Sequence, residues 1–364
     1  MIQGLLIGVF VLFVFLMRAW IAHGTGFWCD EFVQIQQGSE SLFRLFERVS
    51  HETGPLGPIE LFFATLIGKP LIALGLHPHL ALRTETILFS IGTGLVAFGS
   101  SVLTPRQRWL WFGWTAVCTA VNAMSVNFRP YSGYLFFSAT MTFLGLEVFS
   151  GKFRFGKYVY FLCATIVVSS WGYPYSAFPF SVLIVAVLFS NLRKNDKLNL
   201  LVLFAFSVLL RFTWFILIRE QGHNTPRSFE AIVQTFRESH WKQIFSEIVH
   251  SFSGPGTSLK VVGLFFLIGA VLVYFRKRSV FFFLVGVFAA GIILPLIVNT
   301  VFGYTPIVRQ NLPALVPWGL FLIWGVDWVL SYCRASRTFV PIAVSVGFTL
   351  LFFVYAVWKP FGHW

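Results

Sequence analysis

Residues 280–302 read VFFFLVGVFAAGIILPLIVNTVF and contain no charged side chain. A helix needs roughly 20 apolar residues to cross a bilayer, so this stretch is long enough to span one. Similar runs recur along the chain, in which 57% of the residues are hydrophobic and 11% are charged. Soluble proteins carry about 25% charged residues. Because the runs lack the strict alternation of a barrel strand, they predict an all-α, polytopic membrane protein.

The basic residues are grouped in short clusters that separate the apolar runs. The formal net charge is +13, but clustering between apolar segments is what the positive-inside rule produces, so we expect membrane lipids as partners and no nucleic acid. The clusters are Arg106/Arg108, Lys152/Arg154/Lys157, Arg193/Lys194/Lys197, Arg276/Lys277/Arg278 and Arg334/Arg337. The turns that alternate with them hold only Arg129 and Arg309. This pattern predicts that the clusters face the cytoplasm and the turns face outside.

Residues 56–75 form the one apolar run that we expect not to span. Counting it as a span would put Arg106 and Arg108 outside, against the charge pattern. The run also contains Pro58, Glu60 and Lys69, which interrupt or charge a helix. The predicted architecture therefore has about eleven spans, with the N-terminus inside. They cover residues 2–22, 81–103, 109–127, 131–150, 158–172, 174–190, 199–218, 259–275, 280–302, 312–332 and 339–358.

Two long polar segments on the predicted outer side divide the chain into three parts. Residues 1–218 form the first transmembrane module, which includes the outer loop 23–80. Residues 219–258 form a second outer loop, and residues 259–364 form the C-terminal helices. The two loops hold ten of the 14 acidic residues. This concentration favours chemistry at the outer face; the alternative is that loops hold charges because the bilayer excludes them.

The first outer loop carries the strongest candidate chemistry. Asp30 and Glu31 follow the first helix closely, and a carboxylate of raised basicity can deprotonate an acceptor hydroxyl there. The alternative is an ordinary solvated pair at a helix end. Residues 39–50 have an apolar face that predicts an amphipathic helix lying in the interface. His51 and Glu52 follow it and would provide further ligands for a divalent metal, unless they only supply the polarity of a turn.

Several short motifs follow the acidic pair in a fixed order. They are Gly54-Pro55-Leu56-Gly57-Pro58, Leu82-Arg83-Thr84, Asn127-Phe128-Arg129-Pro130-Tyr131, Trp171-Gly172-Tyr173-Pro174-Tyr175 and Val308-Arg309-Gln310-Asn311-Leu312-Pro313. This order resembles the GT-C superfamily of polyprenyl-phosphate-sugar-dependent glycosyltransferases, in particular the protein O-mannosyltransferase, aminoarabinose transferase and bacterial Rgt-like group. The chain departs from the family at His51-Glu52-Thr53, where the family has His-Pro-Pro.

The resemblance implies a GT-C-like fold and a specific reaction. A sugar would move from a polyprenyl-phosphate donor to a hydroxyl of a lipid, glycan or protein acceptor, with inversion, at the outer face of a bacterial inner membrane. Asp30 would be the general base, and Glu31 would support it or bind a divalent metal. The lipid phosphate is a stable leaving group, so catalysis needs mainly a base and cations that bind the phosphate.

Four residues of the outer turns are candidates for substrate binding, in addition to His51 and Glu52 of the first outer loop. Arg309 and Arg129 lie at membrane depth, and arginine suits bidentate binding of a phosphate; the alternatives are snorkelling to the headgroups or a structural ion pair. Tyr131 and Tyr304 would stack on the sugar or hydrogen-bond the phosphate, although aromatic belts at membrane interfaces explain them equally well.

Three of the charged residues inside the predicted spans, Arg18, Arg83 and Glu85, bear on the competing functions. Arg18 lies near the outer end of the first helix, where we expect it to snorkel. Arg83 and Glu85 are expected to play a structural part, as a pair. The spans otherwise hold few charges and show no internal repeat, which ranks a transporter or flippase below the transferase. A non-catalytic membrane subunit of an envelope assembly is the third hypothesis.

Overall fold

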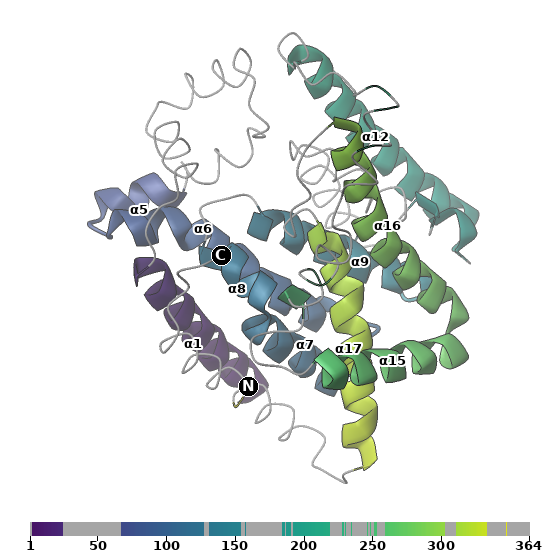
Figure 1. Ribbon diagram of the computed structural model, residues 1–364, viewed down its shortest axis with the longest axis horizontal. Helices are drawn as coiled ribbons and strands as arrows, with labels where there is room; N and C mark the ends of the chain where they lie inside the picture. Colours follow the sequence, from purple (N-terminus) through teal and green to yellow (C-terminus); the bar gives the residue numbers. More distant parts are fainter. Residues whose placement is uncertain are drawn as a thin grey trace.

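The computed structural model describes most of the helical body of the chain (Figure 1). The described residues are 2–24, 67–126, 131–153, 157, 184–185, 187–190, 192–218, 228, 230, 234, 246, 248, 251–252, 259–302, 311–332 and 347. Every regular element in this part is a helix, which confirms the predicted all-α class there. The predicted spans 158–172 and 339–358, most of 174–190 and the amphipathic helix 39–50 lie outside it.

Five helices of the described part are long and apolar enough to cross a membrane. They cover Gly4–Gly24, Pro78–Gly99, Tyr131–Phe149, Arg278–Ile297 and Leu312–Ser331. Each corresponds to one of the predicted spans. These helices indicate a membrane protein, while the total of about eleven spans stays a prediction.

Helix α1 (Ile2–Gly24) packs antiparallel to helix α6 (Pro78–Gly99). Near the end of α1, the carbonyl of Ala22 accepts a hydrogen bond of 2.7 Å from Arg83 Nη1, close to the start of α6. In the first half of α1, the ring of Phe10 lies 6.2 Å from that of Trp109, which also contacts Phe98 at the end of α6. The N-terminus of α1 therefore lies at the same end of the bundle as the C-terminus of α6.

The described part of the run that was expected not to span is short and exposed. Helix α5 (Lys69–Ala73) has no buried residue. It ends in a Schellman motif, in which Gly75 adopts a φ of 88° and Leu76 N donates to Leu71 O. His77 then caps α6, whose first residue, Pro78, has the fixed φ that favours a helix start.

A broken helix replaces the single span predicted at 109–127. Helix α7 (Pro105–Val117) begins with a capping box, in which Thr104 accepts from Gln107 N and the Gln107 side chain accepts from Thr104 N. It ends at Cys118, whose ψ of 124° is not helical, and helix α8 (Thr119–Val126) follows at once. The prediction of one continuous helix was wrong, because Arg18 of α1 and Asn122 of α8 stabilise the break.

Helix α9 (Tyr131–Phe149) runs parallel to α6. The ring of Phe89, midway along α6, lies 5.8 Å from that of Phe137 in the first half of α9. At their ends, Glu147 Oε1 accepts hydrogen bonds of 2.8 and 3.0 Å from the backbone N–H and the hydroxyl of Ser101. The starts of α6 and α9 therefore lie at one end of the bundle, and their ends at the other.

Two of the predicted basic clusters meet at this second end, which we call the basic end. Lys157 forms an ion pair with Glu147, and Lys152 Nζ donates to Ser101 O at 3.1 Å. Arg108 Nη2 donates to Ser100 O at 2.7 Å, and Arg106 forms an ion pair with Asp327 of a later helix. The cations thus satisfy the carbonyls left open at the helix ends. This agrees with the prediction that these two clusters share one side of the membrane.

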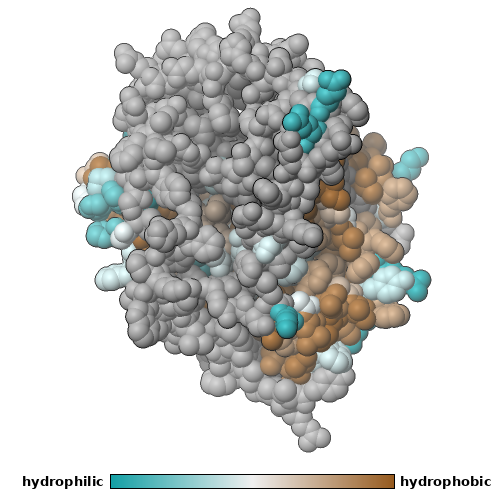
Figure 2. Space-filling view, in the orientation of Figure 1, coloured by the Kyte–Doolittle hydropathy of each residue, from teal (hydrophilic) through white to brown (hydrophobic). Residues whose placement is uncertain are grey.

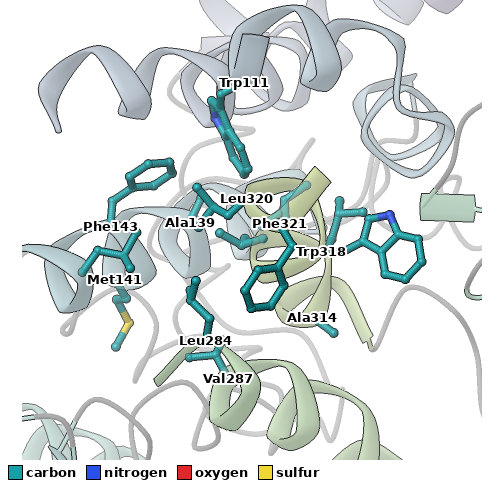
Figure 3. Packing of buried hydrophobic residues seen from close by; sticks show 14 of the residues in the cluster. Trp111, Ala139, Met141, Phe143, Leu284, Val287, Ala314, Trp318, Leu320 and Phe321 are labelled. Atoms are coloured by element: carbon teal, nitrogen blue, oxygen red, sulfur yellow. The ribbon is translucent and has the colours of Figure 1, made fainter. Parts of the chain in front are cut away.

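The later helices surround the core. They are α12 (Lys194–Ile218), α15 (Leu259–Arg276), α16 (Arg278–Phe302) and α17 (Leu312–Tyr332). Figure 3 shows Leu284 and Val287 of α16 pointing toward Phe321 of α17, with Trp111 reaching in from α7. All four side chains are buried and belong to one apolar cluster. Since Asp327 lies at the basic end, the start of α17 lies at the opposite end.

Apolar side chains are exposed on the outside of the bundle. Figure 2 shows them gathered on the side where α15 and α16 lie. The exposed apolar residues of these two helices are Val261, Leu264, Leu267, Val271, Phe275, Phe282, Val285, Ile293 and Ile297. A contiguous apolar face of this kind is unfavourable in water but needs no cover in lipid, so it supports the membrane assignment.

Candidate functional site

Most of the predicted site residues lie outside the described part of the chain. Tyr131 is the exception: it is the first residue of α9 and is buried, with 4% of its surface exposed. The others are Asp30, Glu31, His51, Glu52, Arg129, Tyr304 and Arg309. Their roles therefore stay predictions, and the described structure fixes only the helix ends that the neighbouring segments extend.

The helix termini next to the predicted site residues lie together at the end of the bundle opposite the basic end. It holds the C-terminus of α1, the N-terminus of α9 and the N-terminus of α17, where Asn311 Nδ2 donates to Gly291 O at 3.0 Å. We call it the open end. Gly24 closes α1 six residues before Asp30, and the extended reach of six residues is at most about 22 Å. Arg129 and Arg309 precede Tyr131 and Asn311 by two residues each.

Arg18 is the centre of a buried polar network between four helices. Its Nε donates to Asn122 Oδ1 at 3.1 Å, its Nη1 to Ser90 Oγ at 2.6 Å and its Nη2 to Thr115 O at 3.1 Å. Only 1% of the residue is exposed. The prediction that Arg18 snorkels to the headgroups was wrong, because three other helices supply the partners that the guanidinium would otherwise find in water.

The same network closes the break between α7 and α8. Asn122 Nδ2 donates to Ala116 O at 2.8 Å and to Cys118 O at 3.0 Å, while Arg18 satisfies Thr115 O. The backbone of the break is paired as well, since Asn122 N donates to Cys118 O at 3.0 Å and Cys118 N donates to Trp114 O at 2.8 Å. Every one of these freed backbone groups therefore has a partner inside the protein, as an interruption at membrane depth requires.

Arg83 and Glu85 do not form the pair that their spacing suggested. Arg83 is fully buried and bonds to Ala22 O of α1. Glu85 is buried with 6% exposed and lies two positions further along α6, on the opposite side of the helix. The ion pairs among the described residues do not include one between them. The spans thus contain more buried charge than the sequence alone indicated.

Three histidines meet at the open end. The ring of His77 lies 5.0 Å from that of His23 and 5.1 Å from that of His79. His23 and His77 are exposed. Among the described residues no group of three His, Cys, Asp or Glu side chains is arranged to hold a metal ion. The proposed metal ligands Asp30, Glu31 and His51 lie outside these residues, so no step of the chemistry below depends on a metal.

Sequence reasoning missed most of the buried polar groups in the described part of the bundle. Arg18 gave a signal, since a charge inside an apolar helix points to a buried partner or a function. Asn122, Ser90 and Ser132 gave none, because isolated small polar residues are common in membrane helices. Comparison of the chain with protein-family models gives no match, and comparison with curated proteins gives no match either.

Proposed function

We propose that the protein is an integral membrane glycosyltransferase that uses a polyprenyl-phosphate-linked sugar as donor. The acceptor is a hydroxyl of a lipid, a glycan or a protein at the outer face of a bacterial inner membrane. The proposal rests on the order of the motifs that resembles the GT-C superfamily. The structural observation that supports it most is that α1 ends beside the start of α6, at the open end. The segment that leads to Asp30 begins there.

A lipid-linked donor requires its reactive groups at the membrane surface, and three features fit that requirement. Asp30 follows Gly24, the last residue of α1, by six residues, which limits their separation to about 22 Å. Arg129 adjoins the N-terminus of α9, and Arg309 adjoins that of α17. Both helices begin at the same end as α1 finishes. One carboxylate and two guanidinium groups within reach of one end are the groups that the reaction needs.

The proposed reaction is a single displacement. Asp30 takes the proton of the acceptor hydroxyl, whose oxygen attacks the anomeric carbon as the bond to the phosphate oxygen breaks. The polyprenyl phosphate leaves with the bonding electron pair, and the charge on its oxygens is stabilised by Arg309 and Arg129. Glu31 supports the position and basicity of Asp30. Attack opposite to the leaving group inverts the anomeric centre.

The test of the reaction class is sugar transfer by the purified protein in lipid. We expect one member of a panel of polyprenyl-phosphate sugars to be consumed, with release of polyprenyl phosphate and labelling of a membrane-extract acceptor. A wild-type protein that consumes none of the donors with extract present contradicts the proposal. Glu230→Gln serves as the control variant, because Glu230 is an exposed acid of the other outer loop.

The broken helix favours a lipid or solute transporter as the second candidate. Interrupted helices and buried charges such as Arg18 are features of transporter sites. Against this, the carbonyls freed at the break are already bound by Arg18 and Asn122, so they do not offer a site to an ion. Flux of a labelled lipid across proteoliposomes, without consumption of any sugar donor, would favour this candidate. A non-catalytic subunit would neither move the labelled lipid nor consume a sugar donor.

A further inference from the structure

Glu85 of α6 is a buried carboxyl group that has no hydrogen-bond or ion-pair partner within the described part of the chain. Only 6% of the residue is exposed. None of the hydrogen bonds or ion pairs among the described residues involves it, whereas Glu147 and Asp327 at the basic end each have an arginine or lysine partner. Burying a carboxyl group inside a membrane span without a partner is costly. A group kept under these conditions calls for an explanation other than packing.

The register of α6 shows which neighbour Glu85 faces. Residues four and seven positions apart share one side of a helix, so Glu85 lies above Phe89 and Gly92. Phe89 contacts Phe136 of α9 with 5.6 Å between the ring centroids. A Cβ atom on Gly92 would lie 2.9 Å from the Phe136 ring. This side of α6 therefore packs on α9, and Glu85 lies on it toward the open end.

Ser132 occupies the matching position on α9. It precedes Phe136 by one turn, as Glu85 precedes Phe89, and the two helices are parallel. Both residues therefore lie at the same level on facing sides. Ser132 is fully buried, and its Oγ has no hydrogen-bond partner within the described part of the protein. Two polar side chains without a hydrogen-bond partner in the described part thus lie toward the open end, Glu85 in the second turn of α6 and Ser132 at the start of α9, next to Tyr131.

We propose that Glu85 and Ser132 bind hydroxyl groups of the donor sugar. This proposal rests on the proposed function and specifies which part of the donor the helices recognise. The carboxylate accepts hydrogen bonds from sugar hydroxyls, and the serine hydroxyl donates one or accepts another. The sugar supplies the partners that the protein lacks. Glu85 and Ser132 are positioning residues for the sugar and take no part in the proton transfer.

The experiment compares lipids with and without a sugar. Binding of undecaprenyl phosphate, and of undecaprenyl phosphate carrying glucose, mannose or galactose, is measured in nanodiscs for the wild type, Glu85→Met and Ser132→Ala. The wild type is expected to bind at least one sugar-bearing lipid more tightly than the bare lipid. Glu85→Met should weaken that binding about tenfold, the size expected for a lost hydrogen bond to a charged group, and leave the bare lipid unaffected. Ser132→Ala should weaken it several-fold.

Two controls separate recognition from folding. Ser138→Ala removes another buried serine hydroxyl of α9 that has no partner in the described part, and should change neither affinity. Glu85→Met should unfold at the wild-type temperature or above it, since it removes an unsatisfied buried carboxyl group. A structural role for Glu85 predicts the reverse, a lower unfolding temperature with sugar-bearing and bare lipid affected equally.

The outcomes also separate this inference from the proposed function. If binding depends on both Glu85 and the sugar but the protein transfers no sugar, the sugar-binding inference stands and the glycosyltransferase proposal is rejected. If Glu85→Met transfers sugar with unchanged affinity and unchanged KM for the donor, the sugar-binding inference is rejected and the glycosyltransferase proposal stands. A wild type that binds all four lipids equally also contradicts the inference.

Discussion

Arg18 links α1 to the three helices beside it, and its loss should affect stability more than that of any exposed cation. Arg18→Met leaves Asn122, Ser90 and the Thr115 carbonyl without their buried donor. We expect the free energy of unfolding to fall by about 3 kcal/mol or more, the usual size for breaking a buried charged network. Thermal unfolding in detergent measures it. Arg193→Met, at an exposed arginine, is the control and should leave the transition unchanged.

If Arg18→Met unfolds at the same temperature as the wild type, the guanidinium reaches the headgroups and the buried network does not stabilise the fold. The sequence marked Arg18 as a charge out of place, but it did not reveal the partners. Asn122, Ser90 and Thr115 come from three different helices, and only packing brings them to one guanidinium. Glu85 is similar: its spacing from Arg83 suggested a pair, whereas the opposite sides of α6 separate the two residues.

At the scale of the elements, the tightest contact is the crossing of α15 and α17, which Figure 1 shows running across one another. A Cβ atom on Gly269 would lie 1.8 Å from Phe321 O, and one on Gly325 would lie 2.0 Å from Phe265 O. Both neighbours are backbone atoms that cannot move aside. Glycine is therefore needed at both positions for the two backbones to approach.

Gly269→Leu should separate these helices and destabilise the protein strongly, beyond the 1–3 kcal/mol or so of ordinary overpacking. We expect loss of the monodisperse peak in size-exclusion chromatography and a lower unfolding temperature. Gly263→Leu is the matched control on the same helix, because a Cβ atom there meets nothing within 4 Å. Equal behaviour of the two variants would show that the crossing does not hold the fold together.

The sequence predicted the existence of the long helices well, but it did not predict where a helix is interrupted. Helices α1, α6, α9, α16 and α17 each correspond to a predicted span, because long apolar runs leave few alternatives in a bilayer. The break at Cys118 could not be predicted, since no proline or glycine marks it. It exists because Arg18 and Asn122 satisfy the carbonyls it frees, and those contacts are tertiary.

At the scale of the whole molecule, the described helices have a basic end and an open end. The charge pattern predicted that Arg106, Arg108, Lys152 and Lys157 lie on one side, and their shared contacts agree. The positive-inside rule predicts that the basic end faces the cytoplasm. The proposed site residues could not be located in the same way, because all of them except Tyr131 lie outside the described part of the chain.

Cysteine labelling tests this orientation directly. Lys152→Cys at the basic end and His77→Cys at the open end, each exposed and each in a background without native cysteines, should label from opposite sides. A membrane-impermeant maleimide applied to intact spheroplasts should modify His77→Cys, and inverted vesicles should be needed for Lys152→Cys. Labelling of both from one side would contradict the assignment of α6 as a membrane span.

The central claim is that Asp30 is the base of a sugar transfer at the open end. Its most direct test is turnover of the donor that the panel identifies, by the purified protein in nanodiscs, with Asp30→Asn beside the wild type. We expect Asp30→Asn to fold normally and to lower kcat by about 100-fold or more, the range for loss of a general base. Glu230→Gln should keep the wild-type rate. Wild-type turnover by Asp30→Asn would contradict the account.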